Sequence, residues 1–193
     1  MSRFRRGILA RVLHVTPSEW TYEWDASKGH LDSNGYTLSG VNGYGGGLAY
    51  TDDGALFTVS NYQNVTVTFN DLAPERCVFE STFNIEQLGS VGFNFYISSG
   101  DDTCHIQFIK DSNDWRMGIQ TTQYGYAFAT GLESELNNVD CTLKVEFVSD
   151  STKKVYLNNV LLFEDMTYKA SDTNRIWVRY DDKVLIKSLK WKF

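Results

Sequence analysis

Residues 91–97 read VGFNFYI, and the alternation within this stretch decides the class of fold. The apolar residues occupy every second position, namely Val91, Phe93, Phe95 and Ile97. Asn94 and Tyr96 lie between them and would point to the opposite face. A two-residue period of this kind is typical of a β-strand with one face in a core and the other in water. The stretch therefore predicts a half-buried strand.

The same alternation recurs along the chain on both sides of this stretch. The longest run covers residues 77–88. Further strands are predicted at residues 20–24, 56–60, 65–69, 104–110, 115–122, 141–149, 174–180 and 184–193. Polar turns separate the later strands at intervals of about 8–12 residues, which is typical of a β-sandwich. We therefore predict an all-β fold, an antiparallel β-sandwich of the jelly-roll kind.

Two local patterns refine this prediction. Residues 153–164 predict a hairpin that turns at Asn158 and Asn159, because Asn tolerates the positive φ of a type I′ turn. Six glycines lie between residues 35 and 47, and they predict bends or tight turns rather than a helix. No Gly-Lys-Ser/Thr follows them, so this stretch is not a phosphate-binding loop.

Charge and hydropathy exclude two classes of partner. The net charge of −6 argues against nucleic acid, which requires a basic surface. No stretch approaches the ~18 apolar residues of a membrane span, so we expect no membrane partner. The charge is also uneven, because residues 1–20 carry four arginines and one glutamate, a net of +3, which leaves −9 on the remainder.

This asymmetry divides the chain into a basic arm, residues 1–19, and one sandwich domain, residues 20–193. We expect the arm to dock on an acidic partner surface through its basic and apolar side chains, Arg3, Phe4, Arg5, Arg6 and Ile8. A frayed terminus is the alternative reading. Arg11 and His14 interrupt the apolar run that a signal peptide needs, so we expect synthesis in the cytoplasm without classical export.

The three cysteines, Cys77, Cys104 and Cys141, are an odd number without Cys-x-x-Cys spacing. Each falls at the start of a predicted strand. Free cysteine is among the residues most often buried, so we predict three reduced, buried thiols.

The order of the strands resembles a known superfamily. The stretches that carry the likeness are GFNFYI at 92–97, IQFI at 106–109, WRMGI at 115–119, LKVEF at 143–147, VYLNNV at 155–160 and IKSLKW at 186–191. This pattern resembles the concanavalin A-like lectin and glucanase superfamily, in its laminin-G-like branch. It covers about residues 56–193, and Asn159 stands where the branch usually has Gly. The resemblance implies the fold and leaves the function open, because such folds host many activities.

Residues 1–9 resemble the beginning of structural proteins of tailed phages and prophages. This second resemblance implies a virion component, such as a head decoration, a fibre or a tail-associated adhesion protein. It also implies capsid or tail proteins as partners, a homo-oligomeric state and a location in the virion.

Enzymatic chemistry finds little support in the sequence. The related glucanases carry Glu-x-Asp-x-x-Glu on one strand, and retaining enzymes need two carboxylates ~5–5.5 Å apart. This chain has no such run. Cys104 and His105 are adjacent, so their side chains would leave a strand on opposite faces. We therefore predict a protein that is not an enzyme and has no cofactor.

Calcium is plausible for laminin-G-like relatives, and two pairs of turn residues offer carboxylates. These pairs are Asp101 with Asp102 and Asp181 with Asp182. The spacing of a calcium loop is absent, so we interpret them as solvated turn residues and assign no metal site.

Exposed aromatic side chains beside planar polar groups are the means by which proteins bind saccharides. The candidate glycan-binding residues are Trp115, Tyr124, Tyr126, Trp177, Arg179, His105 and Tyr96. The alternative is that these rings pack against loops or the arm, because Trp and Tyr are usually mostly buried. We predict a non-catalytic, lectin-like virion protein that displays this surface. A free carbohydrate-binding module is the alternative, and a glycoside hydrolase is the weaker one.

Overall fold

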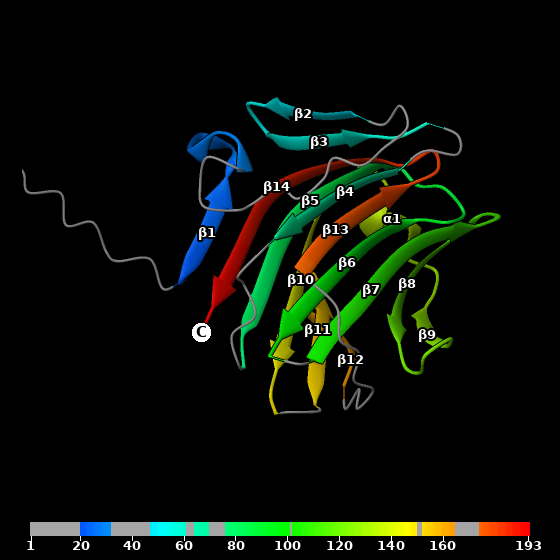
Figure 1. The fold of residues 1–193 in the computed structure, drawn as a ribbon. Coiled ribbons are helices and arrows are strands. Elements are labelled where there is room, and N and C mark those ends of the chain that lie inside the picture. Colours follow the sequence, from blue (N-terminus) through cyan, green and yellow to red (C-terminus); the bar gives the residue numbers. More distant parts are fainter. Residues whose placement is uncertain are drawn as a thin grey trace, which may run out of the picture.

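The computed structural model describes residues 20–31, 47–60, 64–69, 76–100, 102–149, 152–164 and 174–193. Within these ranges the chain forms two antiparallel sheets packed face to face (Figure 1). The predicted concanavalin A-like jelly roll is confirmed. The arm lies outside the described residues, and so do the predicted docking residues Arg3, Phe4, Arg5, Arg6 and Ile8.

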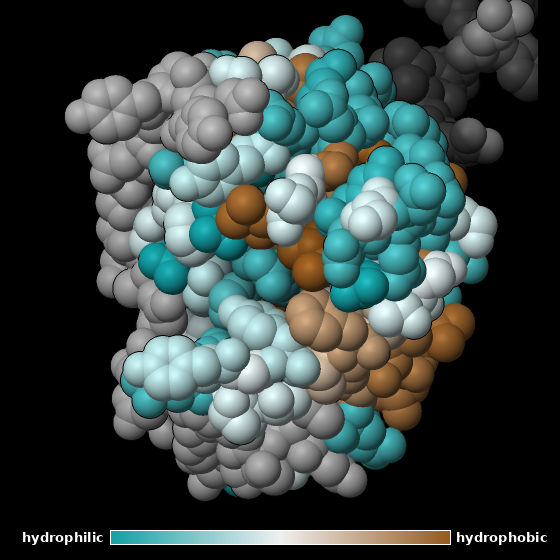
Figure 2. Space-filling model, turned by 90° about the vertical axis from the view of Figure 1, so that its right-hand side faces the viewer, coloured by the Kyte–Doolittle hydropathy of each residue, from teal (hydrophilic) through white to brown (hydrophobic). Residues whose placement is uncertain are grey.

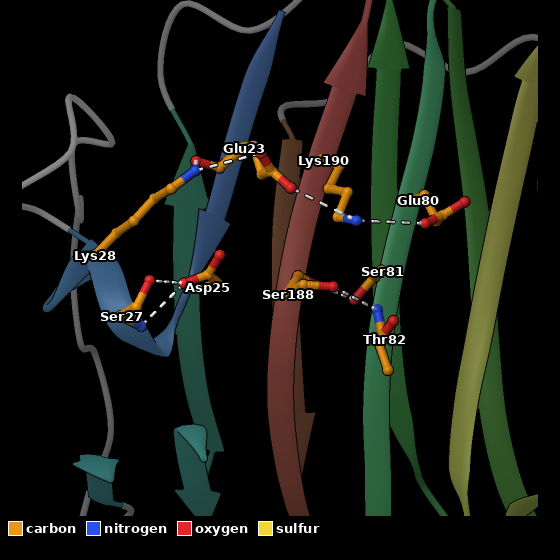
Figure 3. Close-up of polar contacts among 9 residues, drawn as sticks. All are labelled: Glu23, Asp25, Ser27, Lys28, Glu80, Ser81, Thr82, Ser188 and Lys190. Atoms are coloured by element: carbon orange, nitrogen blue, oxygen red, sulfur yellow. Dashed lines mark hydrogen bonds and ion pairs between the residues drawn. The ribbon is translucent and has the colours of Figure 1, made fainter. Parts of the chain in front are cut away.

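Sheet A has the order β12-β11-β10-β5-β14-β3-β2, and β1 pairs with one end of β14. Its strands are β1 (Tyr22–Asp25), β2 (Gly47–Thr51), β3 (Gly54–Thr58), β5 (Val78–Gln87), β10 (Asp140–Phe147), β11 (Lys153–Leu157), β12 (Val160–Phe163) and β14 (Lys183–Lys192). The register of β5 against β14 shifts between Ile186 and Ser188. At this irregularity the Ser81 hydroxyl donates to the Ser188 carbonyl oxygen at 2.9 Å, and the amide of Thr82 donates to Ser188 Oγ at 3.3 Å (Figure 3).

Sheet B has the order β4-β13-β6-β7-β8-β9. Its strands are β4 (Asn64–Phe69), β6 (Phe93–Ser99), β7 (Asp102–Asp111), β8 (Asp114–Gln120), β9 (Tyr126–Ala129) and β13 (Asn174–Arg179). Strands that are far apart in the sequence lie side by side here, because β13 sits between β4 and β6. This arrangement places side chains of β13 beside those of β6.

The core fills the space between the sheets with the inward residues of the alternating strands. Aromatic rings dominate its centre. Phe83 packs edge-on against Phe93 at 5.5 Å and against Phe108 at 5.2 Å, measured between ring centroids. Edge-to-face pairs of this kind are worth about 0.5–1.5 kcal/mol each beyond the burial of their area. Phe93, the first residue of the opening stretch to lie in a strand, is fully buried, as its alternation predicts.

Several local predictions are confirmed. Asn158 and Asn159 have φ values of 50° and 64° and join β11 to β12, as a type I′ turn requires. All three cysteines are free and buried, and burial raises the pKa of Cys77 to about 11 and those of Cys104 and Cys141 to about 12. Two short strands lie outside the predicted ones: β2 begins in the glycine-rich stretch, and β9 begins at Tyr126.

Two helical segments occur among the described residues, η1 (Ala26–Lys28) and α1 (Glu133–Leu136). Neither has the length or the apolar character to cross a membrane.

Two turn carboxylates are buried rather than solvated, so their interpretation from the sequence is wrong. Asp102 at the start of β7 lies 2.8 Å from Lys153 Nζ at the start of β11, and both side chains are almost wholly buried. The contact is an ion pair rather than a well-formed hydrogen bond, and it joins the two sheets. Asp182 lies between β13 and β14, where its Oδ1 accepts from the amide of Gly89 at 2.6 Å.

Gly89 is needed at this position because the chain passes very close to the turn before Asp182. A Cβ atom added to Gly89 would lie 2.1 Å from the carbonyl oxygen of Tyr180. The backbone, rather than a flexible side chain, would have to move.

Candidate functional site

The outward faces of the two sheets differ in charge, and this difference selects the candidate site. On sheet A the outward lysines lie against glutamates (Figure 3). Lys190 Nζ is 3.6 Å from a carboxylate oxygen of Glu23 and 3.9 Å from one of Glu80. Lys28 Nζ is 3.5 Å from Glu23.

Farther along the same face, Lys144 pairs with Glu146 at 2.5 Å, and Lys154 pairs with Glu164 at 2.6 Å. Exposed pairs of this kind contribute only about 0–1 kcal/mol each to stability. These pairs balance the charges of the face among themselves. We therefore do not place the site on sheet A.

The outward face of sheet B carries aromatic rings, amides and arginines in two rows that cross the strands. The first row runs Arg175, Tyr96, His105, Gln120 and Tyr126. The second row runs Trp177, Asn94, Gln107, Gly118 and Phe128. Side chains alternate along each strand, so every second residue of five neighbouring strands meets on this surface.

His105 is the centre of the first row. Its ring stacks on Tyr96 with centroids 3.9 Å apart, and Tyr126 meets it edge-on at 5.3 Å. Nε2 of His105 lies 2.9 Å from Oδ1 of Asn94, whose own amide nitrogen donates to the carbonyl of Gly92. His105 Nε2 is therefore the donor of this pair. Asn94 is fully buried although it is on the outward face, so the prediction that this face of the strand lies in water is wrong.

Arginine and tryptophan side chains stack along β13. The guanidinium carbon of Arg179 lies 3.8 Å from the centroid of the Trp177 ring. Arg175, two residues before Trp177, lies 3.9 Å above the ring of Tyr96 and 5.6 Å from that of Trp177. Such contacts between guanidinium groups and aromatic rings are attractive, by about 0.5–2 kcal/mol. They hold the planar groups in fixed positions on the surface.

Burial and hydrogen bonding also act on Arg179. Its Nη2 donates to the carbonyl of Val91 at 3.2 Å. Desolvation lowers the pKa of Arg179, and the neighbouring Tyr96 and Asp182 raise it in part. The guanidinium remains charged at any physiological pH because its ordinary pKa is so high.

The β9 end of the surface is more open. Figure 2 views the molecule from the side on which β8 and β9 lie, and hydrophilic residues cover most of that side, with smaller hydrophobic areas between them. Phe128 lies here, 41% exposed, over the bare Cα of Gly118. Its ring faces that of Tyr126 with centroids 5.9 Å apart.

The structure brings together five of the seven candidate residues: Tyr96, His105, Tyr126, Trp177 and Arg179. Tyr96 and His105 are only 7% and 8% exposed, so their expected exposure is wrong, and they support the neighbouring residues of the surface. Tyr124 lies in the loop just before β9 and is 87% exposed, so it borders the surface. Trp115 is only 3% exposed and belongs to the core. Its expected exposure is wrong, because Trp115 shares its side of β8 with the buried Met117 and Ile119.

Gln120 and Phe128 belong to the surface but were absent from the predicted set. The alternation of β8 carries the signal for Gln120, which is on the side opposite to Ile119. Phe128 carried no such signal, because β9 was not predicted as a strand.

The described residues offer no cluster of metal ligands, and the paired glutamates of β5 are engaged by lysines. No three His, Cys, Asp or Glu side chains among them gather as metal ligands. Glu80 and Glu86, which share a face of β5, pair with Lys190 and Lys183 respectively.

Comparison with known proteins is informative for the fold alone. The chain matches no protein-family profile and no curated protein sequence. Among solved structures, it resembles the carbohydrate-binding module CBM66 from Bacillus subtilis with a TM-score of 0.55 and 14% identity, over 82% of this chain and 96% of that one. It resembles the metal-free carbohydrate recognition domain of Emp46p with a TM-score of 0.58 and 15% identity, over 86% and 90% of the two chains.

A third similar structure is the ligand-binding domain of botulinum neurotoxin serotype D in complex with N-acetylneuraminic acid. The TM-score is 0.51 and the identity 14%, over 90% of this chain but only 47% of that one. These likenesses define the class of fold: the described strands form a β-sandwich of the lectin-like, concanavalin A type.

Proposed function

We propose that this protein is a non-catalytic carbohydrate-binding module and that the outward face of sheet B is its binding surface. The observation that carries the proposal is the two rows of side chains, in which the rings of Tyr126 and Trp177 lie beside amide and guanidinium groups. Sugars present apolar faces that stack on rings and hydroxyl groups that bond to planar polar groups. The hydrogen bonds of His105 hold these groups in place before a ligand arrives.

Two of the similar structures support the proposal. One is described as a carbohydrate-binding module and the other as a carbohydrate recognition domain. Their resemblance lies in the fold, so the support for binding comes from the residues of this chain.

Binding to a panel of immobilised poly- and oligosaccharides tests the proposal. We expect at least one saccharide to bind, and Trp177→Ala to weaken binding about tenfold or more, because stacked rings dominate such sites. Tyr156→Ala is the matched control, since Tyr156 is an aromatic residue of the outward face of sheet A. Equal loss in both variants, or binding to no saccharide, would contradict the proposal.

The virion assignment is a finer proposal and rests on the arm. Its support is the +3 charge of residues 1–20 ahead of a remainder of −9, together with the resemblance of residues 1–9 to phage proteins. In this proposal residues 1–19 attach the module to a capsid or tail protein, and the module is displayed outward. Deletion of residues 1–15 should abolish incorporation into particles and leave saccharide binding intact. Unchanged incorporation would exclude an anchoring role for the arm.

A further inference from the structure

The arginines on the outward face of sheet B differ in their electrostatic surroundings. Arg116 on β8 is neutralised, because its guanidinium lies 3.0 Å from Asp111 and 2.6 Å from Asp114. Arg179 on β13 forms no ion pair with any carboxylate in the described part of the chain. Its polar contact is the carbonyl of Val91, and its Nε is buried without a hydrogen-bond partner.

Asp182, a carboxylate whose charge acts on Arg179, is already engaged elsewhere. Asp182 is fully buried, and its Oδ1 and Oδ2 accept from the backbone amides of Gly89 and Arg179. Asp182 makes the electrostatic potential at Arg179 less positive, but these hydrogen bonds come from backbone amides and not from the guanidinium of Arg179. Arg179 therefore presents a cation to the surface, with its guanidinium carbon 3.8 Å from the centre of the Trp177 ring.

Among the described residues of the two rows, none carries a negative charge. Arg175 lies on the other side of Trp177 along β13. The remaining members of the two rows are neutral amides, aromatic residues, glycine and the imidazole of His105. In the described part of sheet B, the outward carboxylates of Asp111 and Asp114 lie at the β7–β8 hairpin, where Arg116 binds them.

We propose, as an extension of the proposed function, that this surface selects saccharides that carry a carboxylate group. The guanidinium of Arg179 receives the carboxylate, Trp177 supports the sugar ring, and the row of amides binds its hydroxyl groups. A guanidinium matches the two oxygens of a carboxylate in plane, and such charge-assisted hydrogen bonds are about twice as strong as neutral ones. The chain as a whole carries −6, so the attraction is local to this surface and does not steer distant ligands.

The test compares polygalacturonate with methyl-esterified polygalacturonate, which has the same sugar without the charge. Affinity is measured by isothermal titration calorimetry with the full chain. We expect the acidic polymer to bind at least tenfold more tightly. Arg179→Gln should weaken that binding about 10- to 100-fold, because a charge-assisted hydrogen bond is lost. Arg116→Gln is the control and should leave binding within about twofold, since Arg116 is already neutralised.

Polyglutamate separates saccharide recognition from simple attraction to a polyanion. We expect the protein not to bind it. Equal binding of polyglutamate and polygalacturonate would overturn the inference. Equal binding of the acidic and esterified polymers, with loss in Trp177→Ala, would also overturn it but leave the proposed function standing. Binding to no saccharide at all would remove both.

Discussion

The hydroxyl oxygen of Tyr126 lies 2.8 Å from Nδ1 of His105, and this hydrogen bond joins β9 to β7 across the intervening strand β8. With the His105 proton on Nε2, which donates to Asn94, Nδ1 accepts from the Tyr126 hydroxyl, and the 3.2 Å contact of Nδ1 with Gln120 Oε1 is then not a hydrogen bond. The bond fixes Tyr126, a ring at the open end of the candidate surface, relative to the centre of sheet B.

The Tyr126→Phe variant should therefore loosen the β9 end of the surface while keeping the ring. We expect a loss of about 0.5–1.5 kcal/mol in the free energy of unfolding, the usual net value of one hydrogen bond. Urea denaturation measures this loss. Tyr124→Phe is the control, because the Tyr124 side chain is 87% exposed and should give no change. Equal stability of Tyr126→Phe and the original protein would show that the bond does not tie the strands together.

The ion pair of Lys153 and Asp102 should be costly to break from one side. Lys153→Met leaves the Asp102 carboxylate buried without its cation, and we expect about 3–5 kcal/mol of destabilisation. Lys153→Met combined with Asp102→Val replaces the pair by apolar side chains suited to strands, and it should recover most of that loss. Chemical denaturation of the three proteins checks the order. A double variant no more stable than the single one would contradict this account.

Trp115 should contribute to folding and not to saccharide binding. Trp115→Ala leaves a large cavity in the core, and we expect about 3–5 kcal/mol of destabilisation. Trp115→Phe keeps most of the volume, so it should remain folded and bind saccharide as the original protein does. Thermal unfolding and a binding titration of this second variant provide the check. Weaker binding by a fully folded Trp115→Phe protein would return Trp115 to the site.

The sequence predicts those parts of the fold that depend on local pattern. The alternation of residues 91–97 predicts β6, and two asparagines in succession predict the turn between β11 and β12. The same reasoning assigns an outward direction to Trp177. Alternation along β8 also places Trp115 on the inward side, together with Met117 and Ile119.

The neighbours of each strand could not be predicted in this way. Tyr96 lies beside Arg175 only because β13 is inserted next to β6, and no local pattern encodes that order. The burial of Asp102 and Asp182 escaped prediction for the same reason. Acidic residues in turns usually face water, and the partner of Asp102 comes from a strand of the other sheet.

Asp182 should make stability depend on pH in the opposite sense to most carboxylates. Burial raises the pKa of Asp182 to about 7. The hydrogen bonds from the amides of Gly89 and Arg179 and the charge of Arg179 lower it in part, and the charge of Asp181 raises it. The folded protein therefore holds a proton that the unfolded chain releases near pH 4. The contribution is fully present below about pH 4 and is lost as the pH rises through about 7. We expect a decrease of a few kcal/mol over this range.

The Asp182→Asn variant isolates this effect. Its side chain does not ionise, so the decrease in stability between about pH 4 and pH 7 should disappear, although the lost acceptor for the Arg179 amide costs about 1 kcal/mol at every pH. Asp181→Asn is the control, since it removes a charge from the same turn and leaves Asp182 in place. Other carboxylates, such as Asp140 beside Lys187, have a pKa that their partners lower. Their effect on stability falls in the acid range, so it can be distinguished from that of Asp182 in the same pH series. Denaturation at a series of pH values measures all three proteins, and an unchanged slope in Asp182→Asn would show that another group titrates near neutral pH.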